Sequence, residues 1–573
     1  MINITINGRE TSVPVGTTIL QAAQGCGVKI PTLCHYPDQA VKANCRVCVV
    51  DVEEQKNLLP SCSTMAAEGM NIRTNTARVM EARKTILELI LAHHPQDCLH
   101  CIRNGQCELQ ELTTEYNVRQ SCFEQDSRDL PLDISSPAIV RDPNKCILCG
   151  RCIEVCSSIQ TVNALGLAYR GYDSQVVPSM DKDLFETACV MCGQCIHACP
   201  VGAIHEKEQV DDFFQAAADP KKILVTQIAP AVRIAIAEEL GMETGELSMD
   251  KFVAGLKELG FDYVLHTNFT ADLTIMEEGH ELLRRIQEGG ALPMFTSCCP
   301  AWVRFAEVFY PEQLDHLSSC KSPQQMFGSL VKGYWADKMG IDLANIYSVS
   351  IMPCTAKKYE AQRPEMNDSG FQDVDLVLTT REIGRLFKMT GIHPADTQGA
   401  AFDPWMGEYT GAGVLFGATG GVMEAALRTV YEVVTGRDLE QIELTEVRGM
   451  EGLREAEIDL DGTPVKVAVV HGLGNARRIM EDVQNGTSPY HFVEVMACPG
   501  GCVGGGGQPI TTSNTKREER VEAIYGEDRY MPIRKSHENQ EVLSLYLDFL
   551  EEPLGHRSHE LLHTQYTAKN DQV

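Results

Sequence analysis

The chain has 573 residues, a formal net charge of −29 and 23 cysteines. This negative charge disfavours nucleic acid as a partner, and no apolar run reaches the roughly 18 residues that a membrane span needs. The first residues, MINITINGRETSV, alternate between apolar and polar and lack a basic segment, so they predict a strand and not a signal peptide. The cysteines form tight clusters in a long chain, which indicates metal sites in a reducing, cytoplasmic compartment.

The cysteine spacing divides the chain into units and predicts a multidomain protein that combines α+β and α/β folds. The expected units are residues 1–78, 79–137, 138–209 and 210–573.

The first unit is predicted to be a β-grasp domain. Alternating isoleucines precede Asn7-Gly8, a dipeptide typical of a tight hairpin turn, and TTILQAAQGCG then predicts a short helix capped by threonine. Four cysteines follow on the loops, and four thiolates suit a 2Fe–2S cluster. They are Cys34, Cys45, Cys48 and Cys62. The first gap departs from the plant-type ferredoxin spacing, and a structural zinc site is the alternative.

The second unit contains HHPQDCLHCIRNGQCELQ at the end of a predicted helix, ARVMEARKTILELILAHH. Its expected metal ligands are His94, Cys98, Cys101 and Cys107. Three cysteines and one histidine bind either zinc or a 4Fe–4S cluster, and we expect the cluster because the neighbouring sites favour a series of electron carriers.

The third unit repeats the pattern C-x2-C-x2-C-x3-C, which is typical of bacterial ferredoxins with two 4Fe–4S clusters. The fourth cysteine of each run normally binds the other cluster in such proteins. One expected set is Cys146, Cys149, Cys152 and Cys199. The other is Cys189, Cys192, Cys195 and Cys156.

The fourth unit is predicted to be an α/β domain with mostly buried strands at KILVTQIAP, YSVSIMP, DLVLTT and VKVAVVHG. The turns APAV, TSCCPAW, MPCTAKK and MACPGGC follow strand ends, where open α/β sheets bind ligands. Its cysteines are Cys298, Cys299, Cys320, Cys354, Cys498 and Cys502. Adjacent cysteines point in different directions, so one of Cys298 and Cys299 is expected to join Cys354, Cys498 and Cys502 around a cubane. A thiol is then left beside the cluster.

Three segments carry a family resemblance: FTSCCPAW, MPCTAKKYEAQRP and MACPGGCVGGGGQP resemble the signature segments of the FeFe-hydrogenases. The resemblance extends over essentially the whole chain and includes single-chain clostridial enzymes and the catalytic subunits of multimeric NAD(P)-linked hydrogenases. It implies reversible reduction of protons to H2. It also implies an H-cluster, which is a 4Fe–4S cubane joined to a diiron unit that carries CO, cyanide and a bridging dithiolate and that maturation proteins supply.

The resemblance also implies roles for individual residues. It assigns the cubane to Cys299, Cys354, Cys498 and Cys502, with Cys502 as the bridge to the diiron unit, and it suggests that the glycines let backbone approach the cofactor. Lys357 is expected to hydrogen-bond one cyanide, and Ser322 and the backbone near Pro230 the other. Ala231 replaces the serine of some relatives. The expected walls of the pocket are Gln324, Met352, Phe416 and Met496.

A proton route is implied in the order Cys298, Glu278, Ser318, Glu281 and Arg285. Glu278, Glu281 and Arg285 share one face of a helix, where a simple surface ion pair between Glu281 and Arg285 is the alternative. Cys320 has no expected role.

The electron partner stays open in the sequence, because no G-x-G-x-x-G motif follows a strand and opens a helix. The candidates are a soluble ferredoxin and a flavin-bearing subunit that oxidises NAD(P)H, and the resemblance favours the subunit. An iron–sulfur scaffold protein without the diiron unit and an H2 sensor are the alternative functions.

Overall fold

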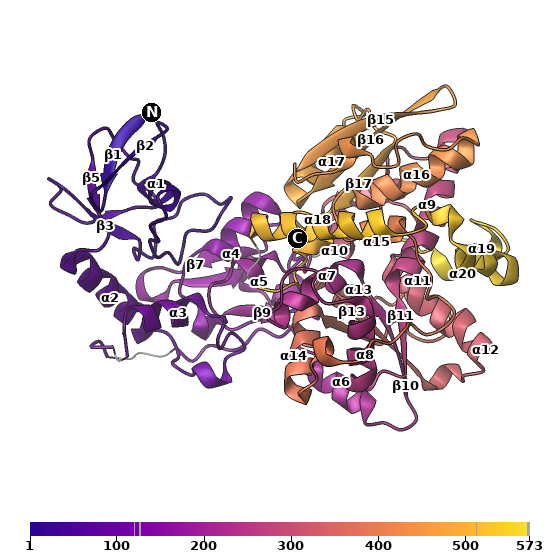
Figure 1. Ribbon diagram of the computed structural model, residues 1–573, viewed down its shortest axis with the longest axis horizontal. Coiled ribbons are helices and arrows are strands. Elements are labelled where there is room, and N and C mark those ends of the chain that lie inside the picture. Colours follow the sequence, from indigo (N-terminus) through magenta and orange to yellow (C-terminus); the bar gives the residue numbers. More distant parts are fainter. Residues whose placement is uncertain (120, 125–127, 511–512, 570–573) are drawn as a thin grey trace.

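The computed structural model describes residues 1–119, 121–124, 128–510 and 513–569 (Figure 1). The first three units lie on one side of the molecule and the large fourth unit on the other. Within the described ranges, no helix has both the length and the apolar character that crossing a membrane would require.

The first unit is a five-stranded sheet in the order β2-β1-β5-β3-β4, covered by α1. Asn7 and Gly8 have φ values of 50° and 84°, as the predicted tight turn requires. Thr18 caps α1 as predicted, and its side chain accepts from the Gln21 N–H at 3.2 Å. The elements are β1 (Ile2–Ile6), β2 (Arg9–Val13), α1 (Ile19–Gly25), β3 (Val49–Val52), β4 (Leu59–Pro60) and β5 (Asn71–Arg73).

The second and third units are small and hold few regular elements. The predicted helix before the His/Cys segment is α2 (Ala77–Ala92), and α3 (Glu108–Glu115) follows that segment. In the third unit Gly150 and Gly193 both have positive φ, of 76° and 71°, and each begins a short helix inside its cysteine run. The elements are β6 (Ile139–Arg141), α4 (Arg151–Glu154), β7 (Leu165–Ala168), β8 (Gln175–Pro178), α5 (Gln194–Ala198) and β9 (Ile204–Glu206).

The fourth unit contains two separate four-stranded sheets, whereas the sequence predicted only one α/β domain without dividing it. The first sheet has the order β11-β10-β13-β14 and is parallel throughout. The second has the order β12-β17-β16-β15, with an antiparallel hairpin at β15–β16. Their bounds are β10 (Ile223–Ile228), β11 (Tyr263–His266), β12 (Met294–Phe295), β13 (Ile346–Met352), β14 (Leu376–Thr379), β15 (Leu453–Leu460), β16 (Thr463–His471) and β17 (Phe492–Met496).

Helix α9 (Thr267–Glu288) runs through the centre of this unit, packed against α11, α15 and α16. All of its residues from 267 to 279 are buried, and so is Glu281, so even its carboxylates Glu277, Glu278 and Glu281 are shielded from solvent. The other helices are α6 (Val210–Ala217), α7 (Pro230–Glu239), α8 (Met249–Leu259), α10 (Pro300–Phe309), α11 (Pro323–Leu330), α12 (Ala336–Met339), α13 (Ala356–Glu360), α14 (Thr380–Thr390), α15 (Gly411–Leu415), α16 (Gly421–Thr435) and α17 (Leu473–Gln484).

The C-terminal segment returns across the fourth unit as α18 (Asn514–Tyr530), α19 (Gln540–Leu545) and α20 (His556–Leu562). Helix α18 packs on α7 and α15, and α20 packs on α11. A backbone bridge between Cys320 and His563 ties the end of this segment to the centre of the unit.

Candidate active site

The candidate active site lies where strand ends of the two sheets come together. In the first sheet, β10 is followed by Pro230, and β13 ends at Met352, just before Cys354. In the second sheet, Cys298 and Cys299 come after β12, and Met496 ends β17 just before Cys498. The Gly507 N–H donates to the Pro353 carbonyl at 2.8 Å, which links the loop after β17 to the loop after β13.

Four thiols from these loops interact in one cluster, in which Cys354 and Cys498 are buried and Cys299 and Cys502 are partly buried. Each member of the set repels at least one other member electrostatically, and the set is Cys299, Cys354, Cys498 and Cys502. Burial raises the pKa of all four thiols, that of Cys354 to about 12. Four buried thiolates are compatible only with cations between them, so this donor set fits the cubane of an H-cluster.

The glycine-rich loop also has a role between segments of the protein itself. A Cβ at Gly505 would lie 2.3 Å from the Pro353 carbonyl oxygen, and one at Gly506 would lie 2.6 Å from the Cys192 carbonyl oxygen. These glycines therefore allow close approach of protein backbone to protein backbone. The result is a tight junction with the third unit, in which the Cys498 sulfur lies 4.0 Å from the same Cys192 oxygen.

Lys357 is largely buried and is held by three acceptors. Its Nζ donates to the Cys298 carbonyl at 3.2 Å, to Ser322 Oγ at 2.7 Å and to Glu360 Oε2 at 2.8 Å. Glu360 also accepts from Gln324 Nε2 at 3.1 Å, whereas Gln324 Oε1 is buried without a partner in the described part of the chain. The sequence analysis missed Glu360, although its position three residues after Lys357 on one helix was a usable signal.

The expected wall residues line the same region. Met352, Phe416 and Met496 are 2%, 6% and 2% exposed. Phe416 and Met496 pack in one apolar cluster with Cys298, whereas Met352 packs in the neighbouring cluster under the first sheet. Pro230 is the first residue of α7, and the next carbonyl, of Ala231, accepts from Gln508 Nε2 at 2.9 Å.

The residues of the expected proton route lie close together and lead outward. Neither carboxylate oxygen of Glu278 has a hydrogen-bond partner at normal geometry among the described residues, and burial raises the pKa of this carboxyl to about 8. Ser318 Oγ donates to Glu281 Oε2 at 3.1 Å. Arg285 Nη2 then donates to Glu281 Oε1 at 2.5 Å, and its side chain is 14% exposed. The ion pair between Glu281 and Arg285, which was the alternative interpretation, is therefore present among the residues of the expected route.

The cysteines expected to hold the 2Fe–2S cluster lie together in the first unit. The Cys48 and Cys62 sulfurs are 3.4 Å apart, and the Cys34 sulfur accepts from the Cys45 N–H at 3.5 Å. The Cys62 thiol also feels the charges of Cys34 and Cys45, so all four belong to one electrostatic cluster.

The second unit presents His94 as a buried imidazole. Its Nδ1 has no hydrogen-bond partner in the described ranges. Burial lowers the pKa of the ring to about 4, so the ring is neutral near pH 7 and its Nδ1 is available to bind a metal ion. Cys101 and Cys107 interact with each other, and a Cβ at Gly202 would lie 2.6 Å from the Cys101 sulfur. His100 instead contacts Asp97 at 2.6 Å on the surface. Cys98 is exposed.

The third unit holds two separate cavities lined by cysteines. One is lined by Cys146, Cys149, Cys152 and Cys199. The other is lined by Cys156, Cys189, Cys192 and Cys195. In each cavity one cysteine comes from the opposite run, so each has room and four sulfurs for a cluster of the cubane type.

A series of cysteine-rich sites that leads to a buried pocket of four thiols defines an iron–sulfur oxidoreductase. Family models match along the chain: "2Fe-2S iron-sulfur cluster binding domain" at 1–77, "NADH-ubiquinone oxidoreductase-G iron-sulfur binding region" at 83–121 and "4Fe-4S dicluster domain" at 145–203. "Iron only hydrogenase large subunit, C-terminal domain" matches 222–506, and "Iron hydrogenase small subunit" matches 514–569.

Similar proteins agree with these matches. NADP-reducing hydrogenase subunit HndD of Solidesulfovibrio fructosivorans is 46% identical, with 99% of each chain covered. Iron hydrogenase 1 of Clostridium pasteurianum is 40% identical over 99% of this chain and 100% of its own. The structure of apo [FeFe]-hydrogenase HydA1 from Chlamydomonas reinhardtii covers 63% of this chain and 99% of its own, at 45% identity and a TM-score of 0.58.

The chain belongs to the FeFe-hydrogenase family. It is an oxidoreductase that acts on H2 and catalyses the reversible reduction of two protons by two electrons. The resemblance seen in the sequence is thus confirmed, and the multidomain α/β organisation with 2Fe–2S, 4Fe–4S and hydrogenase domains is confirmed with it.

Proposed function

We propose that this chain is the H2-activating subunit of an NAD(P)H-linked complex, with one 2Fe–2S cluster, three accessory 4Fe–4S clusters and an H-cluster. The units that we propose are residues 1–78, with a β-grasp fold, 79–137, 138–209 and 210–573. The location that we propose is the cytoplasm, where clustered thiols stay reduced.

The observation that carries the proposal is the pocket of four buried thiols beside the third unit. We assign the H-cluster to the four cysteines of that pocket, with Cys502 as the bridge to the diiron unit. When bound, this group supplies the iron site at which protons and electrons combine to H2. The close approach of the Cys498 sulfur to the Cys192 backbone supports entry of electrons from the cavity lined by Cys192.

The accessory clusters are assigned to the cysteine sets described above. The free Nδ1 of His94 supports its role as a ligand of a 4Fe–4S cluster in the second unit. The two cavities of the third unit support the crossed sets of four sulfurs. Iron is favoured over zinc in the first two units because zinc does not carry electrons between neighbouring clusters.

The side chains around the H-cluster have separate tasks in this proposal. Lys357 presents a buried cation to an anionic ligand, and Ser322 and the backbone near Pro230 face a second such ligand. Gln324, with its unpartnered oxygen, completes the polar lining. Met352, Phe416 and Met496 exclude water. Ala231 cannot supply the hydrogen bond of a serine at its position.

Protons are proposed to move along five groups. The Cys298 thiol exchanges a proton with the carboxyl of Glu278, which burial keeps protonated near neutral pH. Ser318 Oγ passes it to Glu281 Oε2, and Arg285 orients Glu281 at the edge of the solvent. The carboxyl of Glu278 interacts with the Ser318 hydroxyl and the Ser297 N–H, although neither oxygen has a partner at normal hydrogen-bond geometry among the described residues. These weak contacts support the role, because they leave the carboxyl able to exchange hydrogen bonds with its neighbours.

The electron partner is proposed to be a flavin-bearing subunit that oxidises NAD(P)H, with soluble ferredoxin as the alternative. The relative HndD is named a subunit of an NADP-reducing hydrogenase, and residues 83–121 match a region of an NADH-oxidising complex. The formal net charge of −29 disfavours an encounter with acidic ferredoxins.

One experiment tests the core of the proposal. The chain is produced together with the maturation proteins that supply the diiron unit, and its infrared spectrum is recorded with its iron content. CO and cyanide bands are expected, together with iron for all five sites. Absence of those bands after maturation would favour a scaffold protein. Gentle purification from the native host tests the partner, because an active chain that copurifies with no other subunit would contradict the NAD(P)H-linked complex.

A further inference from the structure

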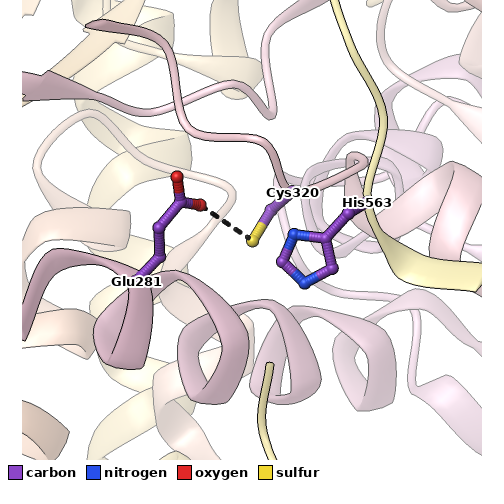
Figure 2. Close-up of side chains that lie close together, drawn as sticks. All are labelled: Glu281, Cys320 and His563. Carbon is purple, nitrogen blue, oxygen red and sulfur yellow. Dashed lines mark hydrogen bonds between the residues drawn. The ribbon is translucent and has the colours of Figure 1, made fainter. Parts of the chain in front are cut away.

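A second cluster of metal-ligating side chains lies at the outer end of the proposed proton route. Glu281, Cys320 and His563 are all buried, and one ligand atom from each lies within 4.8 Å of the others. The Cys320 sulfur is 3.8 Å from Glu281 Oε2. Figure 2 shows the sulfur between the carboxylate, which reaches out from α9, and the imidazole ring. None of the roles described above involves Cys320 or His563.

The backbone holds the thiol and the imidazole opposite each other. Cys320 and His563 are partners in an isolated antiparallel bridge. The Lys321 N–H donates to the Leu562 carbonyl, and the Thr564 N–H to the Ser319 carbonyl, each at 2.8 Å. The separation of these two side chains is therefore set by main-chain hydrogen bonds on both sides and not by flexible side-chain torsions alone.

The imidazole is oriented as a metal ligand. Glu277 Oε2 lies 3.1 Å from His563 Nε2, and the same carboxylate accepts from Tyr546 Oη at 2.6 Å and from the Leu554 N–H at 2.8 Å. This network assigns the ring proton to Nε2 and leaves the Nδ1 lone pair on the side of the cluster, where it faces the Ser319 hydroxyl at 2.8 Å. A metal ion on Nδ1 takes the place of that hydroxyl contact. A carboxylate on the far nitrogen is the usual arrangement around histidines that bind metal ions.

We propose that Glu281, Cys320 and His563 form a binding site for a single Zn²⁺ ion. Thiolate, imidazole and carboxylate are the ligands that zinc takes in proteins. Tetrahedral geometry with Zn–S of about 2.3 Å and Zn–O of about 2.1 Å places sulfur and oxygen roughly 3.6 Å apart, close to the 3.8 Å between Cys320 and Glu281. The ion replaces the thiol proton of Cys320, which is released to solvent.

The charge around the site favours a cation. The cluster contains the carboxylate of Glu281, and a second carboxylate, of Glu277, contacts His563. The guanidinium of Arg285 contacts Glu281 from the other side of the cluster. Access is short, because Ser319 is only partly buried and its hydroxyl lies 2.8 Å from His563 Nδ1 and 3.0 Å from Glu281 Oε2. The exposed His559 lies next to His563, with ring centroids 4.3 Å apart and a tilt of 43° between the rings.

The functional consequence rests on the proton route proposed above. A Glu281 carboxylate bound to zinc cannot accept a proton from Ser318, so an occupied site interrupts turnover without touching any cluster. Binding of a divalent transition metal at this site would therefore inhibit turnover reversibly, and a chelator would restore activity.

The test uses the matured holoenzyme and ZnCl2 as the probe. H2 oxidation with a viologen dye is measured against free Zn²⁺, and the zinc K-edge absorption of the zinc-loaded enzyme reports its ligands. Variant Cys320→Ala removes one ligand, and Cys122→Ala is the matched control because Cys122 is an exposed thiol in the second unit, bonded to Glu88. Iron content and the infrared spectrum verify that zinc has displaced no cluster.

We expect zinc to inhibit the wild type reversibly, with EDTA restoring activity, and to show one sulfur neighbour near about 2.3 Å. Cys320→Ala should keep its turnover without zinc, lose the sulfur neighbour and need at least about tenfold more zinc for inhibition, whereas Cys122→Ala should behave as the wild type does. Equal zinc sensitivity in Cys320→Ala and the wild type, or zinc bound without sulfur, would overturn the site. Zinc bound through Cys320 without inhibition would support the site and refute the proton route through Glu281.

Discussion

Substitution of Glu278 by glutamine tests two properties of this residue separately. One is its role in turnover, and the other is the amount by which its buried carboxyl lowers the free energy of unfolding. The amide keeps the shape of the carboxyl but cannot exchange a proton, so proton transfer to Cys298 should stop during H2 evolution while the H-cluster still assembles. We expect H2 evolution to fall at least about 100-fold, the lower end of what a lost acid–base group costs. The infrared bands of CO and cyanide should stay at normal intensity.

The same variant should be more stable than the wild type, and increasingly so with rising pH. Burial raises the pKa of Glu278 from 4.5 to about 8, so between these values the folded protein binds a proton that the unfolded chain has released. Each pH unit above 4.5 then costs the wild type about 1.4 kcal/mol of unfolding free energy. This amounts to at most about 2 kcal/mol at pH 6 and about 4 kcal/mol at pH 8. Glutamine is neutral throughout and avoids the cost.

The assay is thermal unfolding of the matured enzyme at the two pH values, paired with H2 evolution. A unit of the size of residues 210–573 gains roughly 0.75 kcal/mol/K of unfolding entropy, so the midpoint should rise by roughly 3 °C at pH 6 and roughly 5 °C at pH 8. Glu288→Gln is the matched control, because Glu288 is the exposed last residue of the same helix. Normal turnover in Glu278→Gln would refute its place in the route, and a midpoint difference independent of pH would refute the buried, protonated carboxyl.

Three further predictions follow from the same pocket. Cys298→Ala should keep the infrared bands of the H-cluster and lose at least about 100-fold in turnover. Cys299→Ala should lose those bands, because it removes a ligand of the cubane. Infrared spectra and H2 assays on both variants test this difference. Glu360→Gln should lower the unfolding midpoint by about 4 °C, since removing one partner of a buried ion pair costs about 3 kcal/mol; an unchanged midpoint would show that Lys357 does not depend on it. Gly506→Ala should push the third unit away, so turnover with reduced ferredoxin should fall relative to turnover with a viologen dye, and an unchanged ratio would contradict the junction.

Local patterns in the sequence were sufficient for the elements that carry the site. Runs of β-branched residues predicted the strands that became β10, β13, β14 and β16, and helical spacing predicted α9. Each of these signals is contained within one segment and needs no knowledge of what the segment packs against. The turns that follow strand ends were likewise visible, because open α/β sheets place ligands at that edge.

The partners of the functional side chains could not be predicted in the same way. The division of the strands between two sheets could not be predicted, because it depends on which strands pair. Some of the paired strands, such as β12 and β17, are far apart in the sequence, and no local pattern shows which ones will pair. The glycines after Cys502 were interpreted as room for a cofactor, and no local pattern indicated that Gly505 and Gly506 also lie against the carbonyls of Pro353 and Cys192, far away in the sequence. His563 was likewise invisible as a partner of Cys320, because 243 residues separate them and only the backbone bridge brings them together.

The C-terminal segment connects the chemistry of the pocket to the folding of the chain. Residues 514–569 match a family called a small subunit and contain none of the expected cluster ligands. Their main-chain hydrogen bonds nevertheless hold the strip from Ser319 to Lys321, and Tyr546 holds Glu277 on α9. Because Ser319 donates to Glu281 and α9 carries Glu281 and Arg285, this segment acts on turnover by positioning residues of the proposed proton route. A separate chain could do the same, provided that these backbone hydrogen bonds form.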